Sequence, residues 1–182
     1  MIRNRDSRKL AVRGHDGFTL IELLVVLAVI GIVAALAIPS LLRARITANE
    51  GSAIGSLRTI GSAQTSYFSS AGNGAYASSL AALAARCPNS SQSFLSPELS
   101  TDPAIKSGYS IALAGAAAAL PGAADCNGAA TADDYYSTAV PLSNVTGQRA
   151  FASNGRGTIY FDATAVPPTE AAIAAGTATP IQ

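Results

Sequence analysis

A long apolar run dominates the pattern of the N-terminal third of the chain. Phe18–Ile38 holds 21 residues, nearly all apolar, with one carboxylate at Glu22. As an α-helix this run is about 31 Å long, which matches a hydrocarbon core of roughly 30 Å. A carboxylate at the bilayer centre costs roughly 3 kcal/mol. The pattern therefore predicts a membrane helix in which one charge has a specific use.

Helical periodicity continues beyond Pro39 and predicts one helix over Phe18–Ser70, roughly 80 Å long. We expect it to bend or loosen near Pro39, with Gly31 as a small residue before that point. The segment Ala71–Gly74 ends it with residues that tolerate positive φ. Its apolar stripe should pack on a sheet of the same chain and comprises Ile46, Ala53, Ile54, Leu57, Ile60, Gln64, Tyr67 and Phe68.

The opposite face of this helix carries small residues. Gly51 and Gly55 form a G-x-x-x-G pattern, although each glycine inside a helix costs about 1 kcal/mol relative to alanine. Small faces let helices approach closely. We hypothesise that Gly51, Gly55 and Ser62 face neighbouring helices; the alternative is a weak, solvated face.

The second half of the chain reads as a short helix followed by strands. Ser78–Arg86 predicts the helix, with Ser78 or Ser79 as N-cap. Asn154-Gly155 is typical of a tight hairpin turn. The sequence does not decide whether the tail, 163–182, is ordered against the sheet or loose. Strand signals occur at Gly108–Ala114, Tyr135–Leu142, Arg149–Ser153 and Thr158–Asp162. This half of the chain supports an α+β fold through its strand count.

Charge is distributed unevenly along the chain. Residues 1–17 carry five basic and two acidic side chains, a net of +3, and residues 18–182 carry seven basic and nine acidic, a net of −2. Basic residues before an apolar segment predict a cytoplasmic N-terminus. The total of +1 gives no reason to expect a nucleic-acid partner.

The two cysteines, Cys87 and Cys126, both follow the apolar run. If that part of the chain is exported, they can form a disulfide worth roughly 3–4 kcal/mol through loop closure. The alternative is two free thiols in a reducing compartment. The predicted topology favours the disulfide.

Catalytic and metal-binding patterns are sparse. The single histidine, His15, precedes the apolar run, so we expect no histidine-dependent site and no enzyme activity in the exported part. No cofactor is expected. A weak calcium candidate, for which a solvated turn is the alternative, consists of Asp125, Asn127, Asp133 and Asp134.

Three interpretations of the N-terminus remain at this point. Ala35-Leu36-Ala37 is similar to the cleavage site of an ordinary signal peptide. A simple signal anchor would hold a periplasmic binding domain at the membrane. Neither gives a reason for Glu22. The third interpretation rests on a basic leader ending in Gly17, then Phe18-Thr19-Leu20-Ile21-Glu22 and an apolar helix.

This third pattern resembles the class III signal of type IV prepilins and type II secretion pseudopilins, and it covers Gly17 to about Arg45. The resemblance implies that a prepilin peptidase cuts after Gly17 and methylates the new amine of Phe18. Glu22 then becomes the fifth mature residue and Pro39 the twenty-second. Asp16 departs from the pattern, because a basic residue is common at its position.

The resemblance also implies a role for Glu22. In the family, this glutamate pairs with the N-terminal amine of a neighbouring subunit, and here that would be the amine of Phe18. Such a pairing sets the axial register of assembly. The alternative is a pair with the chain's own Phe18 amine, which we consider plausible before assembly.

The resemblance implies a pilin fold, an α+β fold in which a long helix packs on a small antiparallel sheet, and a layout along the chain. Before assembly, we expect the chain to be a single-pass inner-membrane protein with a periplasmic head. Expected partners are identical or homologous pilin subunits, the prepilin peptidase, an inner-membrane assembly platform and membrane lipid. The expected segments are a cleaved leader (1–17), an assembly helix (18–45), its amphipathic continuation (46–70), the head (71–162) and the tail (163–182).

We therefore expect a filament subunit of a type IV pilus at the cell surface. The alternative within the family is a periplasmic pseudopilin of a type II secretion system. A more distant alternative is the anchored periplasmic binding domain, which would tolerate Glu22→Ala and keep an unprocessed N-terminus.

Overall fold

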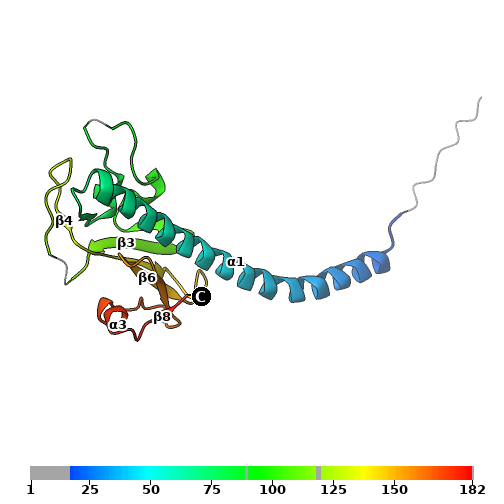
Figure 1. The fold of residues 1–182 in the computed structure, drawn as a ribbon. Coiled ribbons are helices and arrows are strands. Elements are labelled where there is room, and N and C mark those ends of the chain that lie inside the picture. The colour runs from blue at the N-terminus through cyan, green and yellow to red at the C-terminus, as the bar shows by residue number, and fades with distance from the viewer. Residues whose placement is uncertain (1–16, 89, 118–119, 182) are drawn as a thin grey trace, which may run out of the picture. The chain divides into compact units, whose positions relative to one another are not determined.

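A computed structural model describes residues 17–88, 90–117 and 120–181 (Figure 1). The chain divides into two compact units, Met1–Ser40 and Leu41–Gln182, and each is described by itself. Residues 1–16 of the expected leader lie outside the described residues.

The long helix predicted from the sequence is present as α1, Leu20–Ser70. It begins two residues later than predicted because Thr19 caps it: the Glu22 amide donates to the Thr19 hydroxyl at 3.2 Å. Pro39 lies inside α1 and donates no backbone hydrogen bond there. A bend at Pro39 and Gly31 stays a prediction. The helix ends at Ser70, as predicted, and Asn73 and Gly74 in the turn that follows have positive φ angles of 51° and 82°.

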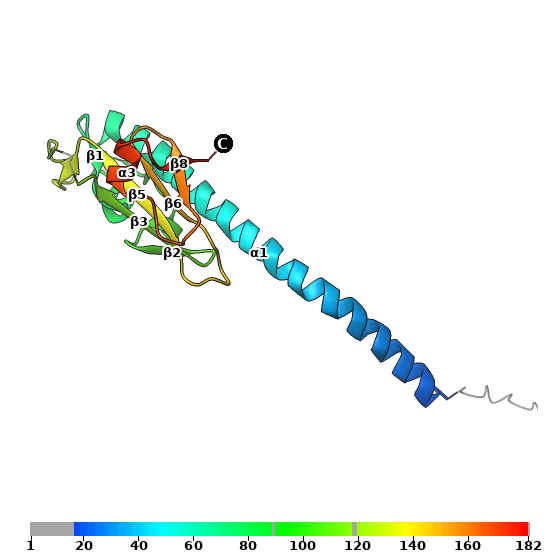
Figure 2. The same cartoon turned by 90° about the horizontal axis from the view of Figure 1, so that it is seen from below.

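The head is built on a six-stranded antiparallel sheet with the order β2-β3-β5-β6-β7-β8 (Figure 2). All four predicted strands occur, with ends that differ by one residue from those expected. A second, two-stranded sheet pairs β1 (Tyr76–Ala77) with β4 (Thr131–Ala132). The strands of the large sheet are β2 (Ala104–Lys106), β3 (Tyr109–Gly115), β5 (Tyr135–Pro141), β6 (Ala150–Asn154), β7 (Ile159–Asp162) and β8 (Thr179–Pro180).

Short elements complete the head. The predicted short helix is α2, Leu80–Ala84, whose N-cap Ser79 accepts from the Ala82 amide. A 3-10 turn follows at Pro97–Leu99. The tail, whose order the sequence left open, forms α3 (Glu170–Ala174) and then β8. The helix α3 lies on the side of the sheet away from α1 (Figures 1 and 2), and β8 pairs with β7 at the edge of the sheet.

The turn between β6 and β7 differs in detail from the tight hairpin predicted at Asn154-Gly155. Gly157 is the residue with positive φ (77°), and its amide donates to the Asn154 carbonyl at 2.9 Å. Gly155 is needed for space instead, since a Cβ there would lie 2.5 Å from the Asp134 carboxylate. The hairpin therefore forms with a longer turn.

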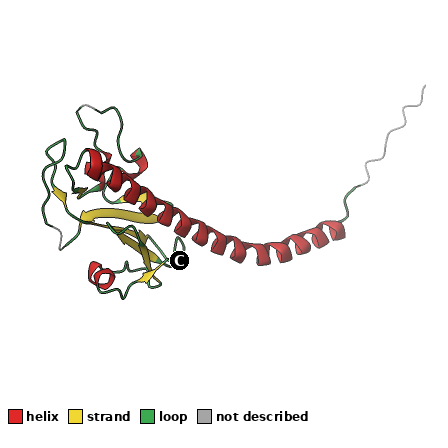
Figure 3. Cartoon of the chain, in the orientation of Figure 1, coloured by secondary structure: helices red, strands yellow, loops and turns green. Residues whose placement is uncertain are grey.

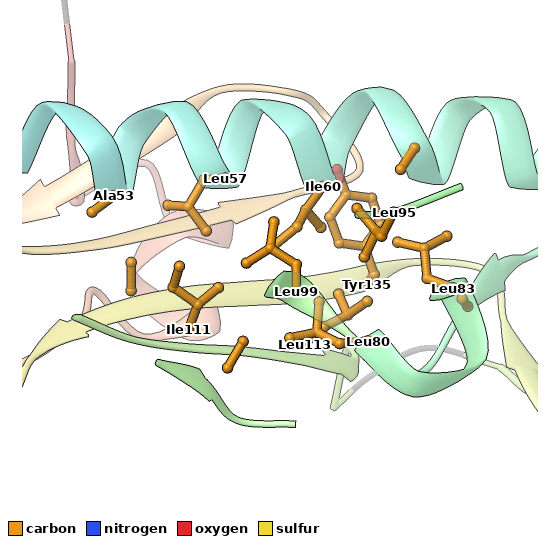
Figure 4. Close-up of a cluster of buried hydrophobic side chains, with 14 of the residues drawn as sticks. Ala53, Leu57, Ile60, Leu80, Leu83, Leu95, Leu99, Ile111, Leu113 and Tyr135 are labelled. Atoms are coloured by element: carbon orange, nitrogen blue, oxygen red, sulfur yellow. The ribbon is translucent and has the colours of Figure 1, made fainter. Parts of the chain in front are cut away.

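The core lies between the C-terminal part of α1 and the sheet (Figures 3 and 4). Ala53, Leu57 and Ile60 point from α1 toward Ile111 on β3 and Tyr135 on β5 (Figure 4). This confirms the predicted stripe over most of its length. Phe68 is the exception: it remains 38% exposed and packs on the Tyr76 ring at the edge of the core.

One polar member of the stripe has a structural role. Gln64 is fully buried, and its amide group forms two hydrogen bonds with the backbone of Ala77, at 2.8 and 2.9 Å. A buried amide without partners would destabilise the core. Gln64 therefore joins α1 to the two-residue strand β1.

Candidate functional site

The first candidate site is the apolar N-terminal segment, which has no covering in the single chain. From Gly17 to Arg45 every residue is exposed except the half-buried Ala34. Phe18 is 76% and Leu20 81% exposed. Within the described residues, α1 is the one helix long and apolar enough to cross a membrane. An apolar surface of this extent needs lipid or other protein against it.

A capping box organises the start of this segment. The Thr19 hydroxyl and amide donate to one oxygen of the Glu22 carboxylate, at 3.1 and 3.4 Å, while the Thr19 hydroxyl accepts from the Glu22 amide. This reciprocal arrangement is the S/T-x-x-E capping box. It gives Glu22 hydrogen-bond donors on its own helix. The box was not predicted from the sequence, although Thr19 and Glu22 have its spacing.

The predicted partner of Glu22 is the α-amine of Phe18, which exists only after cleavage at Gly17. In the intact chain the Phe18 nitrogen is part of a peptide bond. The amine pairing, within the chain or between chains, therefore stays a prediction. The capping box holds the Glu22 carboxylate at Thr19, the residue that follows Phe18.

The small-residue face of α1 is a second candidate. Gly51, Gly55 and Ser62 are all exposed, and no atom lies within 4 Å of a Cβ placed at either glycine. Packing of this face on neighbouring helices stays a prediction.

Hydroxyl groups on this exposed side of α1 bond to their own helix. Thr59, Thr65 and Ser66 each donate to the carbonyl four residues earlier, at 2.9–3.1 Å. Such bonds satisfy the hydroxyl donors without a partner from solvent. The face is therefore polar in composition but internally hydrogen-bonded.

An ion pair fastens α1 to the sheet within the unit Leu41–Gln182. The Glu50 carboxylate is 5% exposed and accepts from Arg149 Nη2 at 2.7 Å and Nε at 2.9 Å. Its other oxygen accepts the backbone amides of Gln148 and Arg149. Burial alone raises the pKa of Glu50, but these hydrogen bonds and the guanidinium charge hold that pKa below its usual range.

The Arg149 guanidinium also lies over two aromatic rings. Its guanidinium carbon lies 5.7 Å from the centre of the Phe151 ring and 5.4 Å from that of Phe161. Both distances are within cation–π range. The ion pair between Glu50 and Arg149 was not predicted, because no local pattern connects Glu50 to a residue 99 positions away.

Cys87 and Cys126 form the predicted disulfide. Their Cα atoms lie 5.5 Å apart, a normal separation for the bond. The Cys126 amide also donates to the carbonyl of Ala71, just beyond the end of α1. The bridge thus holds two long loops against the distal end of the helix.

The acidic residues of the weak calcium candidate have other partners. Asp125 accepts from the Tyr67 hydroxyl at 2.7 Å and from the amides of Asn127 and Ala129. Asp133 accepts the Leu120 amide, and Asp134 the amides of Tyr135 and Gly155. Across the described ranges, no three acidic, histidine or cysteine side chains gather as a metal site. These carboxylates order loops.

Comparison with known proteins agrees with the N-terminal pattern. Residues 12–38 match the family described as the prokaryotic N-terminal methylation motif. Type IV major pilin protein PilA of Myxococcus xanthus (strain DK1622) is 45% identical over 55 residues, or 30% of this chain. The match spans a quarter, 25%, of that pilin's own length. No solved structure matches the chain.

The matched motif, the pilin relative and the long helix on an antiparallel sheet agree with one another. The chain is therefore similar to type IV pilins and pseudopilins in its N-terminal segment and in its fold class.

Proposed function

We propose that this chain is a non-enzymatic structural subunit of a type IV pilus-like filament. The peptidase cuts after Gly17, the amine of Phe18 is methylated, and the subunits polymerise through α1. One observation carries the proposal: every residue of the apolar run Phe18–Ile38 except the half-buried Ala34 is exposed in the single chain. Such a surface is stable in a bilayer and, after extraction, against the same segment of other subunits.

The capping box supports the use of Glu22 in assembly. A carboxylate in the bilayer is costly, and hydrogen bonds from Thr19 offset part of that cost while the subunit waits in lipid. The charge then remains available for the amine of a neighbouring Phe18. Pairing the two buried charges would favour one register over its alternatives.

The location follows from the same features. The basic segment stays in the cytoplasm, the apolar helix spans the inner membrane, and the disulfide-bonded head lies in the periplasm. The partners are then other pilin subunits, the prepilin peptidase and the assembly platform. Similarity to a major pilin favours a surface pilus over a periplasmic pseudopilus.

Mass spectrometry of the N-terminus tests processing. We expect a mature chain that begins at Phe18 and carries one methyl group. A chain that keeps Met1, or one that begins at Ile38 after signal-peptide cleavage, would contradict the proposal. Shearing cells and isolating surface fibres tests which filament the subunit builds. Fibres that contain this chain would identify a surface pilus, whereas a chain confined to a periplasmic filament would belong to a secretion system.

A further inference from the structure

A cavity of about 360 Å³ lies between α1 and the sheet, within the unit Leu41–Gln182. Its size falls in the range of small-molecule sites. The turn between β6 and β7 contributes to its lining, together with Arg58, Gly61 and Thr65 of α1 and Tyr135 and Ser153 of the sheet. Since every lining residue belongs to the head, the cavity is complete within one unit of the chain.

The hydroxyl of Tyr135 differs from those of the other two buried tyrosines. Tyr67 donates to the Asp125 carboxylate at 2.7 Å, and Tyr109 donates to the Arg149 carbonyl at 2.8 Å. Tyr135 is 3% exposed, yet its hydroxyl has no hydrogen-bond partner among the described residues. A buried tyrosine hydroxyl ordinarily has one. Tyr135 therefore presents a polar group that the described protein does not use.

This hydroxyl opens into the cavity. The Tyr135 ring extends from the sheet toward α1 (Figure 4), and its oxygen lies 3.3 Å from the position of a Cβ at Gly61. In the described part of the chain, every buried side-chain oxygen or nitrogen that is sealed from solvent has a partner. The unpartnered Tyr135 oxygen is therefore in contact with the solvent of the cavity. Burial raises the pKa of Tyr135 to about 12, so the hydroxyl stays protonated and can donate.

Ser153 adds a second hydroxyl to the same cavity. It is 3% exposed on β6 and lies two residues after the core residue Phe151, so both side chains are on the face of the sheet toward α1. Its carbonyl accepts from the Ser137 hydroxyl at 3.3 Å, but its own hydroxyl has no partner among the described residues. Two buried hydroxyls without partners in one cavity indicate a polar occupant from outside the chain.

The charge of the lining indicates the kind of occupant. Arg58 is the one charged residue of the lining, and it forms no ion pair with any residue in the described ranges. Asp134 lies beside Gly155 but does not line the cavity, and its carboxylate accepts the amides of Tyr135 and Gly155. A guanidinium and two hydroxyl donors, with no carboxylate in the lining, favour an oxyanion.

We propose that this cavity binds a small organic oxyanion, a carboxylate or a phosphate monoester. Arg58 pairs with the anion, and the hydroxyls of Tyr135 and Ser153 donate hydrogen bonds to it. The apolar part of the ligand contacts Leu57 and Ile159, which also line the cavity. The ligand thus connects α1 to the sheet and to the turn between β6 and β7. This inference concerns the head alone and goes beyond the proposed function.

Ligand-observed fluorine NMR tests the site on the full chain in phosphatidylcholine nanodiscs. The probes are para-fluorobenzoate and para-fluorophenyl phosphate, and para-fluorobenzamide is the uncharged match. Empty nanodiscs correct for partition of the probes into lipid. We expect saturable line broadening of the anions in the millimolar range and several-fold weaker binding of the amide. The anion that binds more tightly identifies whether the site prefers a carboxylate or a phosphate.

Substitutions in the lining separate the three contacts. Tyr135→Phe and Ser153→Ala should each weaken anion binding by about tenfold, because each removes a hydrogen bond to a charged group. Arg58→Gln should remove the preference for the anions over the amide, whereas Arg86→Gln, an exposed arginine outside the lining, should not. Tyr135→Phe should leave the unfolding free energy nearly unchanged. Tyr109→Phe, which loses a hydrogen bond within the protein, should lower that free energy and keep anion binding.

Anions that do not bind the unaltered chain, or that bind no better than the amide, would overturn the proposal and leave ordered water as the occupant of the cavity. Unchanged anion binding by both Tyr135→Phe and Ser153→Ala would overturn it as well. So would a loss of stability in Tyr135→Phe as large as that in Tyr109→Phe, because the Tyr135 hydroxyl would then have a partner in the protein. None of these results depends on filament assembly, so the proposed function is tested separately.

Discussion

Glu50 on α1 and Arg149, the residue before β6, form a two-bond ion pair that connects the long helix to the sheet. Arg149 Nη2 and Nε lie 2.7 and 2.9 Å from one Glu50 oxygen. The other oxygen accepts the backbone amides of Gln148 and Arg149, just before β6. The pair therefore fixes the position along α1, at Glu50, where the end of the loop 142–149 between β5 and β6 contacts the helix.

Removing the cation should destabilise the head. Arg149→Met leaves the buried Glu50 carboxylate with only backbone donors, and unpairing a buried charge costs about 3–5 kcal/mol. The side chain of Arg149 is 41% exposed, so we expect a loss near the lower end, about 3 kcal/mol. Chemical unfolding in detergent, followed by near-ultraviolet circular dichroism, measures it. Arg156→Met, an exposed control, should change stability little.

Stability should fall in acid because of Glu50. Its pKa is lower in the folded head than the ordinary value of 4.5, so the unfolded chain binds the proton more readily. The stabilisation is full above about pH 4.5 and is lost as pH falls through the folded pKa. Thermal unfolding between pH 6 and 3 should show a shallower decline for Glu50→Gln, which is less stable at neutral pH. An identical slope for both chains would contradict this assignment.

The disulfide should contribute strongly to the head. Cys87 and Cys126 are 39 residues apart, and closing a loop of that size stabilises by about 3–4 kcal/mol in the chain-entropy treatment. We expect Cys87→Ser/Cys126→Ser to lower the unfolding free energy by that amount. Reduction of the native chain should reproduce the effect and leave the double variant unchanged.

Glu22→Gln should separate helix capping from charge. The amide oxygen can still accept from Thr19, so α1 should begin normally and the leader should be removed. The variant has no charge to pair with the Phe18 amine, and we expect a large loss of filaments in a shearing assay. Glu98→Gln, which removes an exposed acid from the head, is the control and should assemble. Normal fibres from Glu22→Gln would contradict the pairing.

Gly55→Leu should impair assembly without harming the single chain. No atom lies within 4 Å of a Cβ at this position, and replacing a helical glycine stabilises α1 by up to about 1 kcal/mol. If Gly51 and Gly55 face neighbouring helices, the larger side chain should reduce filament yield. Ala130→Leu is the control for added apolar bulk. Unchanged yield would show that this face remains solvated.

The sequence predicted the parts of the fold that local patterns determine. Phe18–Ser70 has a continuous helical period, and β3, β5, β6 and β7 have recognisable strand composition. β8 and β2 were missed because each is two or three residues long and exists through pairing with a neighbour. Gln64 was assigned to the stripe, but its bonds to Ala77 depend on a turn that composition does not specify.

The candidate site shows the same division. The order and spacing of Gly17, Phe18 and Glu22 are local and specific, so the motif can be identified from the sequence alone. The Glu50–Arg149 pair and the partners of Asp125 join distant segments. Their carboxylates resemble ligand candidates in sequence, and only tertiary contacts reveal that they serve loops and strands.

The internally bonded hydroxyls of α1 have a consequence for solubility. Thr59, Thr65 and Ser66 present oxygen atoms to water while their protons point back to the helix carbonyls. A serine- and threonine-rich surface of this kind is hydrated in the isolated subunit. It loses few hydrogen bonds when a contact removes the water. The same side of the helix can therefore tolerate both a hydrated precursor and a dry contact, with no rearrangement of its side chains between the two.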